Sequence, residues 1–175
     1  MKTKLAVFDF DGTLIPSQSG LRLSIELVQT KKLKKSTGIR LLLWGLCYKA
    51  RLPYNEKTAR QLIFKAFENK NAEEVDAYID QFYKENIDDT VRQPLINIAN
   101  NLKVGGVELV VLSGAFTSTL GSFAKRHDFV HIVGTEMEID DNGNYTGKVE
   151  GECVAGEEKI KQLFAYADNQ FGKDN

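Results

Sequence analysis

Residues 5–14 read LAVFDFDGTL, and this stretch decides the fold class of the chain. Its first four residues are apolar, as in a buried parallel strand, and they lead directly into two aspartates, Asp9 and Asp11. Ligands bind at the edge of an α/β sheet where such strands end. Because side chains two positions apart on an extended chain point to the same side, we expect both carboxylates to face one site.

Paired carboxylates at such an edge suit nucleophilic and acid–base chemistry. One carboxylate can act as the nucleophile and the other as its proton shuttle. A hard cation such as Mg²⁺ would hold the pair and the substrate together, which makes Asp9 and Asp11 the candidate metal ligands as well. Gly12 supplies the turn, and the Thr13 hydroxyl can hydrogen-bond back to it as support. The alternative interpretation is a strand that merely ends in a turn, because Asp and Gly are common turn residues.

The composition is that of a globular protein with one domain, or with a core and one insertion. The chain has 175 residues, of which 42% are hydrophobic, an ordinary fraction. Its 23 basic and 24 acidic residues give a net charge of −1, so we expect no general attraction to nucleic acid. The basic cluster KKLKK at residues 31–35 is interpreted as a solvated loop or helix end. The alternative is that it steers an anionic substrate or touches a membrane surface.

The cysteines and the apolar runs favour a cytoplasmic location. Cys47 and Cys153 lack the spacing of a metal site, which fits a reducing compartment. The chain reaches its first two aspartates after only four apolar residues, so we expect no signal peptide. The most apolar run, LLLWGLCY at residues 41–48, is far too short to span a bilayer. We expect it to form a buried helix or part of an apolar pocket wall.

The pattern of the whole chain predicts an α/β protein with a Rossmann-like parallel sheet. After the strand at residues 4–8, residues 20–88 have helical periodicity and no good strand. The chain then alternates between helices and strands. The later elements are expected as helices at 93–103, 116–126 and from about 156 onward, strands at 107–112 and 129–133, and a β-hairpin at 135–149.

The helical block after the first strand is expected to form a cap. We predict a core of residues 1–15 plus 90–175 and a cap of residues 16–89, which would lie over the aspartates and exclude water. Asn71 is expected to cap one cap helix, and Pro53 to separate two others. The clearest helical face consists of Ala59, Leu62, Ile63, Ala66 and Phe67.

Three later residues would complete a phosphate site around the aspartates. Ser113 and Gly114 follow the second core strand, where a hydroxyl and turn amides would face a phosphate at a helix N-terminus. The alternative is that Ser113 only caps that helix. Lys159 lies at the start of the final predicted helix, where a cation needs a compensating anion, such as Asp9 or a phosphoryl group. Lys161 is the weaker candidate for this role.

Taken together, these motifs resemble those of the haloacid dehalogenase-like hydrolase superfamily. DFDGTL, VVLSG and GEEK occur in the order of its motifs one, two and three. The helical insertion after motif one is similar to the cap of subfamily IB, which includes phosphoserine phosphatase. The stretch VGTEMEID…YTGKVEGECVAGEEK resembles the segment before the motif-three lysine of that subfamily. The resemblance extends from Leu5 to about Leu163.

The resemblance implies an Mg²⁺-dependent phosphatase that acts on a small phosphorylated metabolite. It implies that Asp9 attacks phosphorus to form an aspartyl-phosphate, while Asp11 protonates the leaving alcohol and then activates water. Ser113 and Gly114 would bind phosphoryl oxygens, and Lys159 would neutralise charge. Mg²⁺ would bridge Asp9, the phosphate and the main-chain carbonyl of Asp11. Since the superfamily's dehalogenases lack a second acid there, Asp11 favours a phosphate ester over a haloacid.

The fourth motif of the superfamily, an acidic pair after another core strand, has no counterpart in the expected place. Asp168 and Asp174 are the only later acids, and no apolar strand precedes them, so they are weak candidate substitutes. The sequence therefore looks truncated before a further core strand, and we expect weakened metal binding. In the superfamily fold that strand lies beside the first one. An open edge at residues 4–8 would invite self-association.

The sequence leaves open which phosphorylated compound is the substrate and whether water or another alcohol accepts the phosphoryl group. Where phosphoserine phosphatases carry a glutamate that holds the substrate amine, this chain has Gln18, whose neutral amide cannot pair with an ammonium as a carboxylate does. The apolar residues of the cap, Trp44 among them, are interpreted as helix packing, with a bulkier or lipid-like alcohol as the alternative. His127 and His131 are expected to be structural. The alternatives to a phosphatase are an impaired fragment that only binds phosphate compounds or a partner chain, and a phosphotransferase.

Overall fold

The computed structural model describes residues 4–50 and 55–172, and it has the α/β architecture that the sequence predicts. A parallel sheet with strand order β1-β3-β4 forms the core. A smaller antiparallel sheet, in the order β2-β6-β5, lies beside it. The strands are β1 (Lys4–Phe8), β2 (Lys70–Asn71), β3 (Val107–Phe116), β4 (His131–Thr135), β5 (Met137–Ile139) and β6 (Asn144–Val149).

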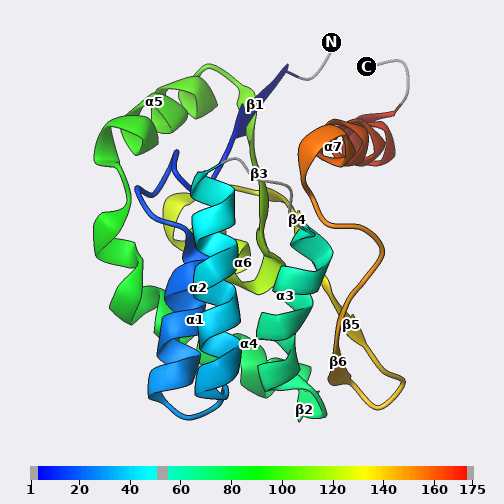
Figure 1. Cartoon of the computed structure of the whole chain (residues 1–175). Helices are drawn as coiled ribbons and strands as arrows, with labels where there is room; N and C mark the ends of the chain where they lie inside the picture. Colours follow the sequence, from blue (N-terminus) through cyan, green and yellow to red (C-terminus); the bar gives the residue numbers. More distant parts are fainter. Residues whose placement is uncertain (1–3, 51–54, 173–175) are drawn as a thin grey trace.

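The helices fall into two groups. Helices α1, α2 and α3 pack on one another in the lower half of Figure 1, whereas α5 and α7 flank β1 at its top. Helix α6 packs against both β3 and β4. The helices are α1 (Ser19–Gln29), α2 (Lys35–Lys49), α3 (Glu56–Phe64), α4 (Ala72–Asn86), α5 (Gln93–Val104), α6 (Thr117–His127) and α7 (Gly156–Phe171).

Strand β3 is the centre of the molecule because it is buried on both faces. Leu109 and Val111 belong to the main core, which also contains residues of α5 and α6. Val110 and Leu112 point to the opposite face and form a second cluster with Leu163 of α7. This alternation follows from the two-residue period of a strand, and it explains why VELVVL reads as one continuous apolar run.

Several sequence expectations about elements are confirmed. The first strand covers residues 4–8, and Pro94 lies in the first turn of α5. The hairpin at 135–149 is present as β5 and β6. The Asn71 side chain caps α4 by accepting hydrogen bonds from the amides of Glu73 and Glu74, at 3.0 and 3.3 Å. The expected break at Pro53 lies outside the described residues.

Three expectations about element boundaries were wrong. Strand β3 continues through Ser113 and Gly114 to Phe116, so these residues do not form a turn at the N-terminus of α6. Residues 20–88 do contain a strand, the two-residue β2, which pairs with β6. The helical face over residues 59–67 is interrupted, because α3 ends at Phe64 and a 3₁₀ turn follows. In each case the deciding contact comes from a distant part of the chain, which local patterns do not report.

The apolar run at residues 41–48 is not a buried helix. Leu41 is only 1% exposed, but Leu42, Leu43 and Leu46 on the other side of α2 are 51%, 57% and 63% exposed. Trp44 lines a cavity, so the run does form part of a pocket wall. No helix within residues 4–50 and 55–172 combines the length and apolarity needed to cross a membrane.

Candidate functional site

A tight loop after β1 holds the two aspartates at the edge of the parallel sheet. Phe10 and Ile15 are fully buried and anchor the loop, and the Ile15 amide donates to the Phe10 carbonyl at 3.1 Å. Gly12 adopts a φ of +81°, a left-handed conformation that favours glycine. Arg92 donates to the carbonyls of Gly12 and Thr13 at 3.0 and 2.9 Å. The loop is therefore fixed by the buried side chains of Phe10 and Ile15 and by the hydrogen bonds from Arg92.

Asp9 is paired with Lys159, although 150 positions separate them in the chain. The Lys159 Nζ lies 2.7 Å from Asp9 Oδ1. The Thr13 hydroxyl donates to the other carboxylate oxygen, Oδ2, at 3.4 Å. Lys159 lies in the first turn of α7, where the positive end of the macrodipole disfavours a cation, and Asp9 supplies the compensating charge. Lys161 is exposed instead and contacts Glu158 at 3.5 Å.

Asp11 lies at the N-terminus of α1, where it contacts Ser19, the first residue of that helix. Its Oδ1 accepts a hydrogen bond from the Ser19 amide at 2.8 Å. Burial raises the pKa of Asp11 to about 6, opposed by the Ser19 amide and reinforced by the charge of Asp9. A carboxyl group with this pKa can both give and take a proton near neutrality.

A cavity of about 170 Å³ brings the sequence-predicted residues together. Its wall includes Asp9, Asp11, Ser113, Gly114 and Lys159, which come from the loop after β1, from β3 and from α7. The cavity is polar, with two carboxylates, an ammonium and a buried hydroxyl facing one small space. It can therefore take a small anionic group beside a carboxylate nucleophile.

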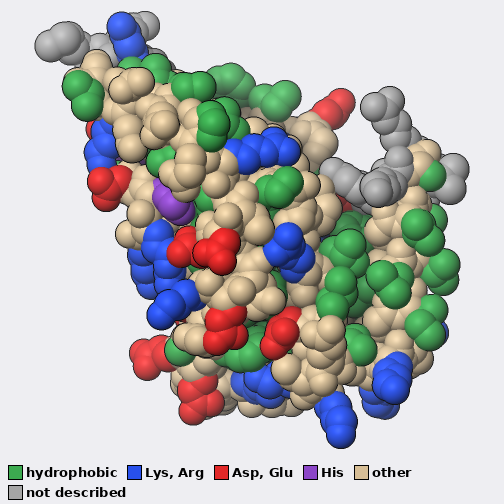
Figure 2. All heavy atoms as spheres, turned by 90° about the vertical axis from the view of Figure 1, so that its left-hand side faces the viewer, with side chains coloured by type: hydrophobic (Ala, Val, Ile, Leu, Met, Phe, Trp, Pro, Cys, Tyr) green, Lys and Arg blue, Asp and Glu red, His purple; other side chains and the backbone are tan. Residues whose placement is uncertain are grey.

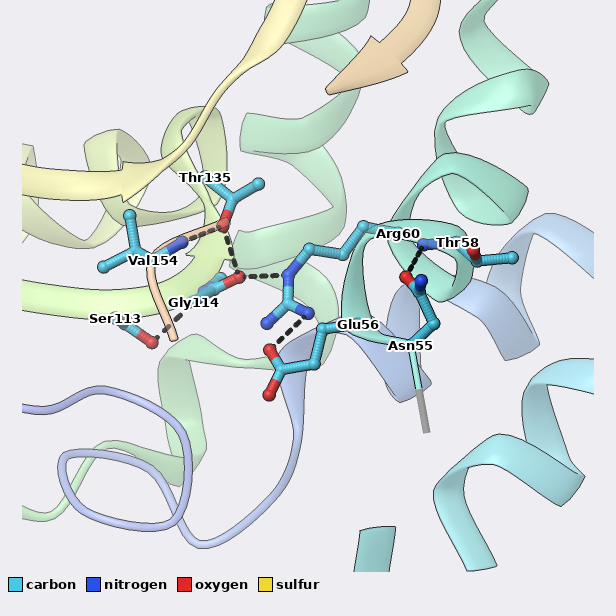
Figure 3. A network of polar contacts seen from close by, with 9 residues as sticks. Asn55, Glu56, Thr58, Arg60, Ser113, Gly114, Thr135 and Val154 are labelled. Atoms are coloured by element: carbon cyan, nitrogen blue, oxygen red, sulfur yellow. Dashed lines mark hydrogen bonds and ion pairs between the residues drawn. The ribbon is translucent and has the colours of Figure 1, made fainter. Parts of the chain in front are cut away.

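The other wall of the cavity includes two charged residues of α3, Glu56 and Arg60, which the sequence argument missed. Arg60 of α3 reaches Gly114 of β3 and donates from Nε to its carbonyl at 2.6 Å (Figure 3). Arg60 also pairs with Glu56 at 2.9 Å. Thr135 donates to the same carbonyl at 3.1 Å and accepts from the Val154 amide at 3.3 Å. The only local signal for Arg60 was its (i, i+4) spacing from Glu56, which is common on helix surfaces.

Ser113 and Gly114 reach the cavity from an irregular part of β3. Ser113 is 2% exposed, and its Oγ accepts from the Ala115 amide at 3.2 Å. It does not cap α6, whose N-cap residue is Phe116. A Cβ at position 114 would lie 2.3 Å from the Arg60 guanidinium and 3.0 Å from the Val154 carbonyl, so a larger residue would displace the Arg60 side chain and crowd the Val154 carbonyl. The pairing of β3 with β4 also shifts in register at this point.

The other residues considered in the sequence analysis differ in their distance from the cavity. Gln18 and Trp44 line the cavity from the cap side. Asp168 is exposed near the end of α7 and is absent from the cavity wall, and Asp174 lies outside the described residues. His127 and His131 lie at the end of α6 and in β4, where each faces a carboxylate.

The carboxylate pair suits a hard divalent cation. Mg²⁺ is usually held by one or two carboxylates together with substrate oxygens and water. Asp9 and Asp11 offer such a pair at one cavity. Across residues 4–50 and 55–172, no group of three or more His, Cys, Asp and Glu side chains is placed to hold a metal. A cation at this pair would share its coordination with substrate and water.

Comparison with known proteins gives a family match over almost the whole chain. The model of a family described as haloacid dehalogenase-like hydrolase matches residues 6–174. No protein of curated function matches the sequence.

Several solved structures share the fold at low sequence identity. A protein of unknown function from Bordetella pertussis Tohama I superposes with a TM-score of 0.83 at 19% identity, over 97% of this chain and 76% of that one. A substrate-bound phosphoserine phosphatase gives a TM-score of 0.65 at 19% identity, over 97% and 73%. A phosphoserine phosphohydrolase-like protein from Francisella tularensis subsp. tularensis SCHU S4 gives 0.62 at 18% identity, over 97% and 73%. At such identities the likeness shows the common fold.

Proposed function

The chain belongs to the haloacid dehalogenase-like hydrolases, and we propose that it hydrolyses small phosphomonoesters through an aspartyl-phosphate intermediate. The observation that carries this proposal is the meeting of Asp9, Asp11 and Lys159 at one polar cavity. The three residues combine a nucleophile, a proton carrier and a cation that can stabilise a phosphoryl group. Asp11 provides a second acid two positions after the nucleophile, and this supports a phosphate ester as the substrate.

In the first step, a carboxylate oxygen of Asp9 attacks phosphorus, and the bond between phosphorus and the alcohol oxygen breaks. Asp11 gives its proton to the leaving oxygen, which departs as the alcohol. The raised pKa of Asp11, about 6, supports this role because a fraction of the carboxyl groups is protonated near neutrality. Its hydrogen bond to the Ser19 amide fixes the direction of the carboxyl group.

In the second step, Asp11 removes a proton from water, and the resulting oxygen attacks phosphorus. The bond between phosphorus and Asp9 breaks, which releases inorganic phosphate and restores the carboxylate. The cap supports this step by limiting access of bulk water, since Arg60 ties α3 to β3 at the edge of the cavity. We place the cap at residues 16–89, between the first strand and α5.

Ser113, Gly114 and Lys159 are the proposed phosphate-binding residues. The Ser113 hydroxyl and the Lys159 ammonium line the same cavity as the nucleophile. Gly12 and Thr13 support the nucleophile through the loop conformation and through the hydrogen bond from Thr13 to Asp9. These contacts hold the reacting groups in place before the substrate binds. Electrostatic stabilisation of a transition state comes mainly from groups that are preorganised in this way.

Mg²⁺ is the proposed cofactor, and Asp9 and Asp11 would hold it. When bound, the cation would neutralise part of the negative charge of the phosphate and of the nucleophile, so that the two can approach. Asp9 is already paired with the Lys159 ammonium, so the cation would share this carboxylate with a positively charged side chain.

The proposed substrate is a small phosphorylated metabolite. The cavity of about 170 Å³ has room for a phosphate and a compact alcohol. Gln18 lies in its wall, and its neutral amide cannot pair with an ammonium of the alcohol as a carboxylate does. We therefore propose a neutral or anionic alcohol rather than strict selection of phosphoserine.

The decisive experiment measures hydrolysis of an aryl phosphate with Mg²⁺ and with a chelator, for the parent chain and for Asp9→Asn. We expect hydrolysis by the parent with Mg²⁺, little with chelator, and a loss of at least about 1,000-fold in kcat for Asp9→Asn, because an amide is a poor nucleophile. Asp168→Asn is the matched control, since Asp168 is an exposed carboxylate outside the cavity, and it should keep the parent rate. Unchanged hydrolysis by Asp9→Asn would remove the proposed nucleophile.

Two further measurements separate the alternatives. An added alcohol acceptor distinguishes a phosphotransferase, which would form a new phosphate ester, from a hydrolase, which releases inorganic phosphate. Trp44, the single tryptophan, lines the cavity, so its fluorescence reports phosphate binding without catalysis. A phosphate-dependent change in Trp44 fluorescence without turnover would indicate a binding protein rather than an enzyme.

A further inference from the structure

The helical hairpin of α1 and α2 carries an apolar face that points away from the rest of the molecule. We call it the hairpin face and define it by five exposed residues: Ile25, Ile39, Leu42, Leu43 and Leu46, which are 45–63% exposed. The four α2 members follow the spacing i, i+3, i+4, i+7, so they form one continuous stripe of the helix. Figure 2 shows hydrophobic side chains gathered along this hairpin, at the right of the view.

A shallow apolar groove runs between the two helices of the hairpin. Its volume is about 360 Å³, and its wall includes Leu21, Ile25 and Val28 of α1 and Ile39 and Leu42 of α2. Large exposed apolar patches on proteins of this size usually mark a surface that contacts something else. The hairpin face and its groove are therefore a candidate contact surface.

The charge of the hairpin is strongly positive. Residues 19–49 contain seven basic residues and one acid, Glu26, whereas the chain as a whole has a net charge of −1. Lys31, Lys34 and Lys35 are exposed at the turn of the hairpin and at the start of α2, and Arg40 is exposed along α2. Figure 2 shows Lys and Arg side chains at the lower end of the hairpin. Leucine-rich helices flanked by lysine and arginine are typical of the membrane–water interface.

The face is also independent of the candidate active site. Leu41 and Trp44 lie on the opposite side of α2, where Leu41 is buried and Trp44 lines the cavity. Residues of the hairpin face are absent from the wall of that cavity. The hairpin can therefore engage a surface while its inner side still covers the site.

We propose that the hairpin face docks on a lipid bilayer that contains anionic phospholipids. The leucine and isoleucine side chains would enter the boundary between headgroups and acyl chains, and the lysines would pair with anionic headgroups. The docking is peripheral, because no helix within the described residues can cross a bilayer. This proposal goes beyond phosphatase activity and does not depend on it.

The charges favour a bilayer over a second copy of the chain. Two copies packed through this face would bring two strongly positive surfaces together, with only one acid in residues 19–49, Glu26, against seven basic residues on each copy. A nucleic acid would engage the lysines but would leave the aliphatic stripe without a partner, since exposed bases bind aromatic rings or hydrogen-bonding groups. An anionic bilayer satisfies both the apolar stripe and the basic flank.

The test is flotation of the full chain with extruded vesicles, made either of phosphatidylcholine alone or of phosphatidylcholine mixed with phosphatidylglycerol. We expect binding to the anionic vesicles, weak binding to the neutral ones, and a loss of binding as salt concentration rises. Asp9→Asn should bind like the parent, so failure of the proposed phosphatase function would leave this result unchanged.

Two double variants test the two parts of the surface, each with a matched control. Ile39→Ser/Leu43→Ser should abolish flotation, whereas Ile160→Ser/Phe164→Ser on α7, with equally exposed apolar residues, should not change it. Lys31→Ser/Lys34→Ser should weaken binding about 30-fold, in line with two lysines at an anionic surface. Lys84→Ser/Lys125→Ser is its control, because both lysines are exposed but lie on α4 and α6.

Three results would overturn the proposal. One is a folded parent chain, verified by circular dichroism, that floats with neither kind of vesicle. Another is equal binding by the parent and by Ile39→Ser/Leu43→Ser. The third is a parent dimer, seen by light scattering, that this double variant dissociates while vesicle binding is absent; that result would assign the face to a second copy of the chain.

Discussion

Lys159 shows how a residue that is unfavourable in its own helix becomes favourable through a distant partner. A cation in the first turn of a helix is opposed by the macrodipole by about 0.3–1 kcal/mol. Lys159 occupies that position in α7 and lies 2.7 Å from Asp9 Oδ1. The same residue lines the cavity that also contains Asp11. Its place in the helix is thus explained by the site and not by the helix.

We predict that Lys159→Ala lowers kcat for phosphomonoester hydrolysis by about 100-fold or more, because a charged group aimed at the transferring phosphate is lost. Steady-state kinetics with an aryl phosphate measures the effect. Lys161→Ala removes an exposed lysine two positions away, and its rate should stay near that of the parent. Equal losses in both variants would mean that the helix, rather than the ammonium of Lys159, supports the reaction.

At the scale of elements, helices α4 and α6 are joined by a two-pronged ion pair. Arg126 of α6 donates to both carboxylate oxygens of Asp80 of α4, at 2.8 and 2.9 Å. The guanidinium also lies over the ring of Tyr83, 5.2 Å from its centroid. This contact lowers the pKa of Asp80 from 3.8 to about 2. The ion pair fixes the position of α4 relative to α6.

We predict that Asp80→Asn lowers the free energy of unfolding at neutral pH by about 0.5 kcal/mol, the size expected for a partly exposed ion pair. Because the folded-state pKa of Asp80 lies below its ordinary value, the stabilisation is complete above pH 3.8 and is lost as the pH falls toward about 2. Chemical denaturation at several pH values measures this difference. The difference in free energy of unfolding between Asp80→Asn and the parent should be constant near neutrality and should become smaller below pH 3.8.

The exposed Asp89 gives the matched control for this effect. Asp89→Asn removes the same charge a few residues away, so a similar loss in both variants would assign the effect to net charge. A difference between Asp80→Asn and the parent that stays the same at every pH would contradict the ion-pair explanation.

Arg60 makes the corresponding link between helix α3 and the parallel sheet. Its guanidinium joins α3 to the Gly114 carbonyl of β3 and to Glu56 of its own helix. One side chain therefore lines the cavity and holds the irregular part of the strand that carries Ser113. No local pattern in α3 distinguishes Arg60 from a solvated arginine, which is why the sequence did not predict it.

At the scale of the whole molecule, the parallel sheet presents β1 as an edge within the described residues. Strand β1 pairs with β3 on one side only. Val7 in this strand is 42% exposed. An uncovered, apolar edge strand offers unpaired backbone groups to another chain. Self-association through this edge stays a prediction.

We predict concentration-dependent self-association of the parent chain and its reduction by Val7→Lys, because a lysine on an edge strand opposes pairing with a second strand. Size exclusion with light scattering measures the average mass over a range of concentrations. Val104→Lys is the control, since Val104 is 90% exposed but lies at the end of α5 rather than on the sheet. A parent chain that stays monomeric at every concentration would refute the prediction.

The sequence by itself determined the fold class, most of the elements and the main members of the candidate site. Apolar runs that end in Asp or Ser predict strands whose carboxyl ends share one edge, because the connections of an α/β sheet leave few other arrangements. This rule places Asp9, Asp11 and Ser113 together before any coordinates are known. The hydrogen-bonding signals of turns and caps, such as that of Asn71, are equally local and equally visible.

Only the tertiary structure decided how β3 passes the site, which cap residue reaches it, and which side of α2 faces solvent. The strand continues to Phe116 because β4 pairs with it there, a contact between distant residues. The 41–48 run is apolar on all sides, so its sequence carries no period that would tell the buried Leu41 from the exposed Leu42 and Leu43. Its orientation follows from packing against α1 and α3, and packing depends on parts of the chain that a local pattern does not contain.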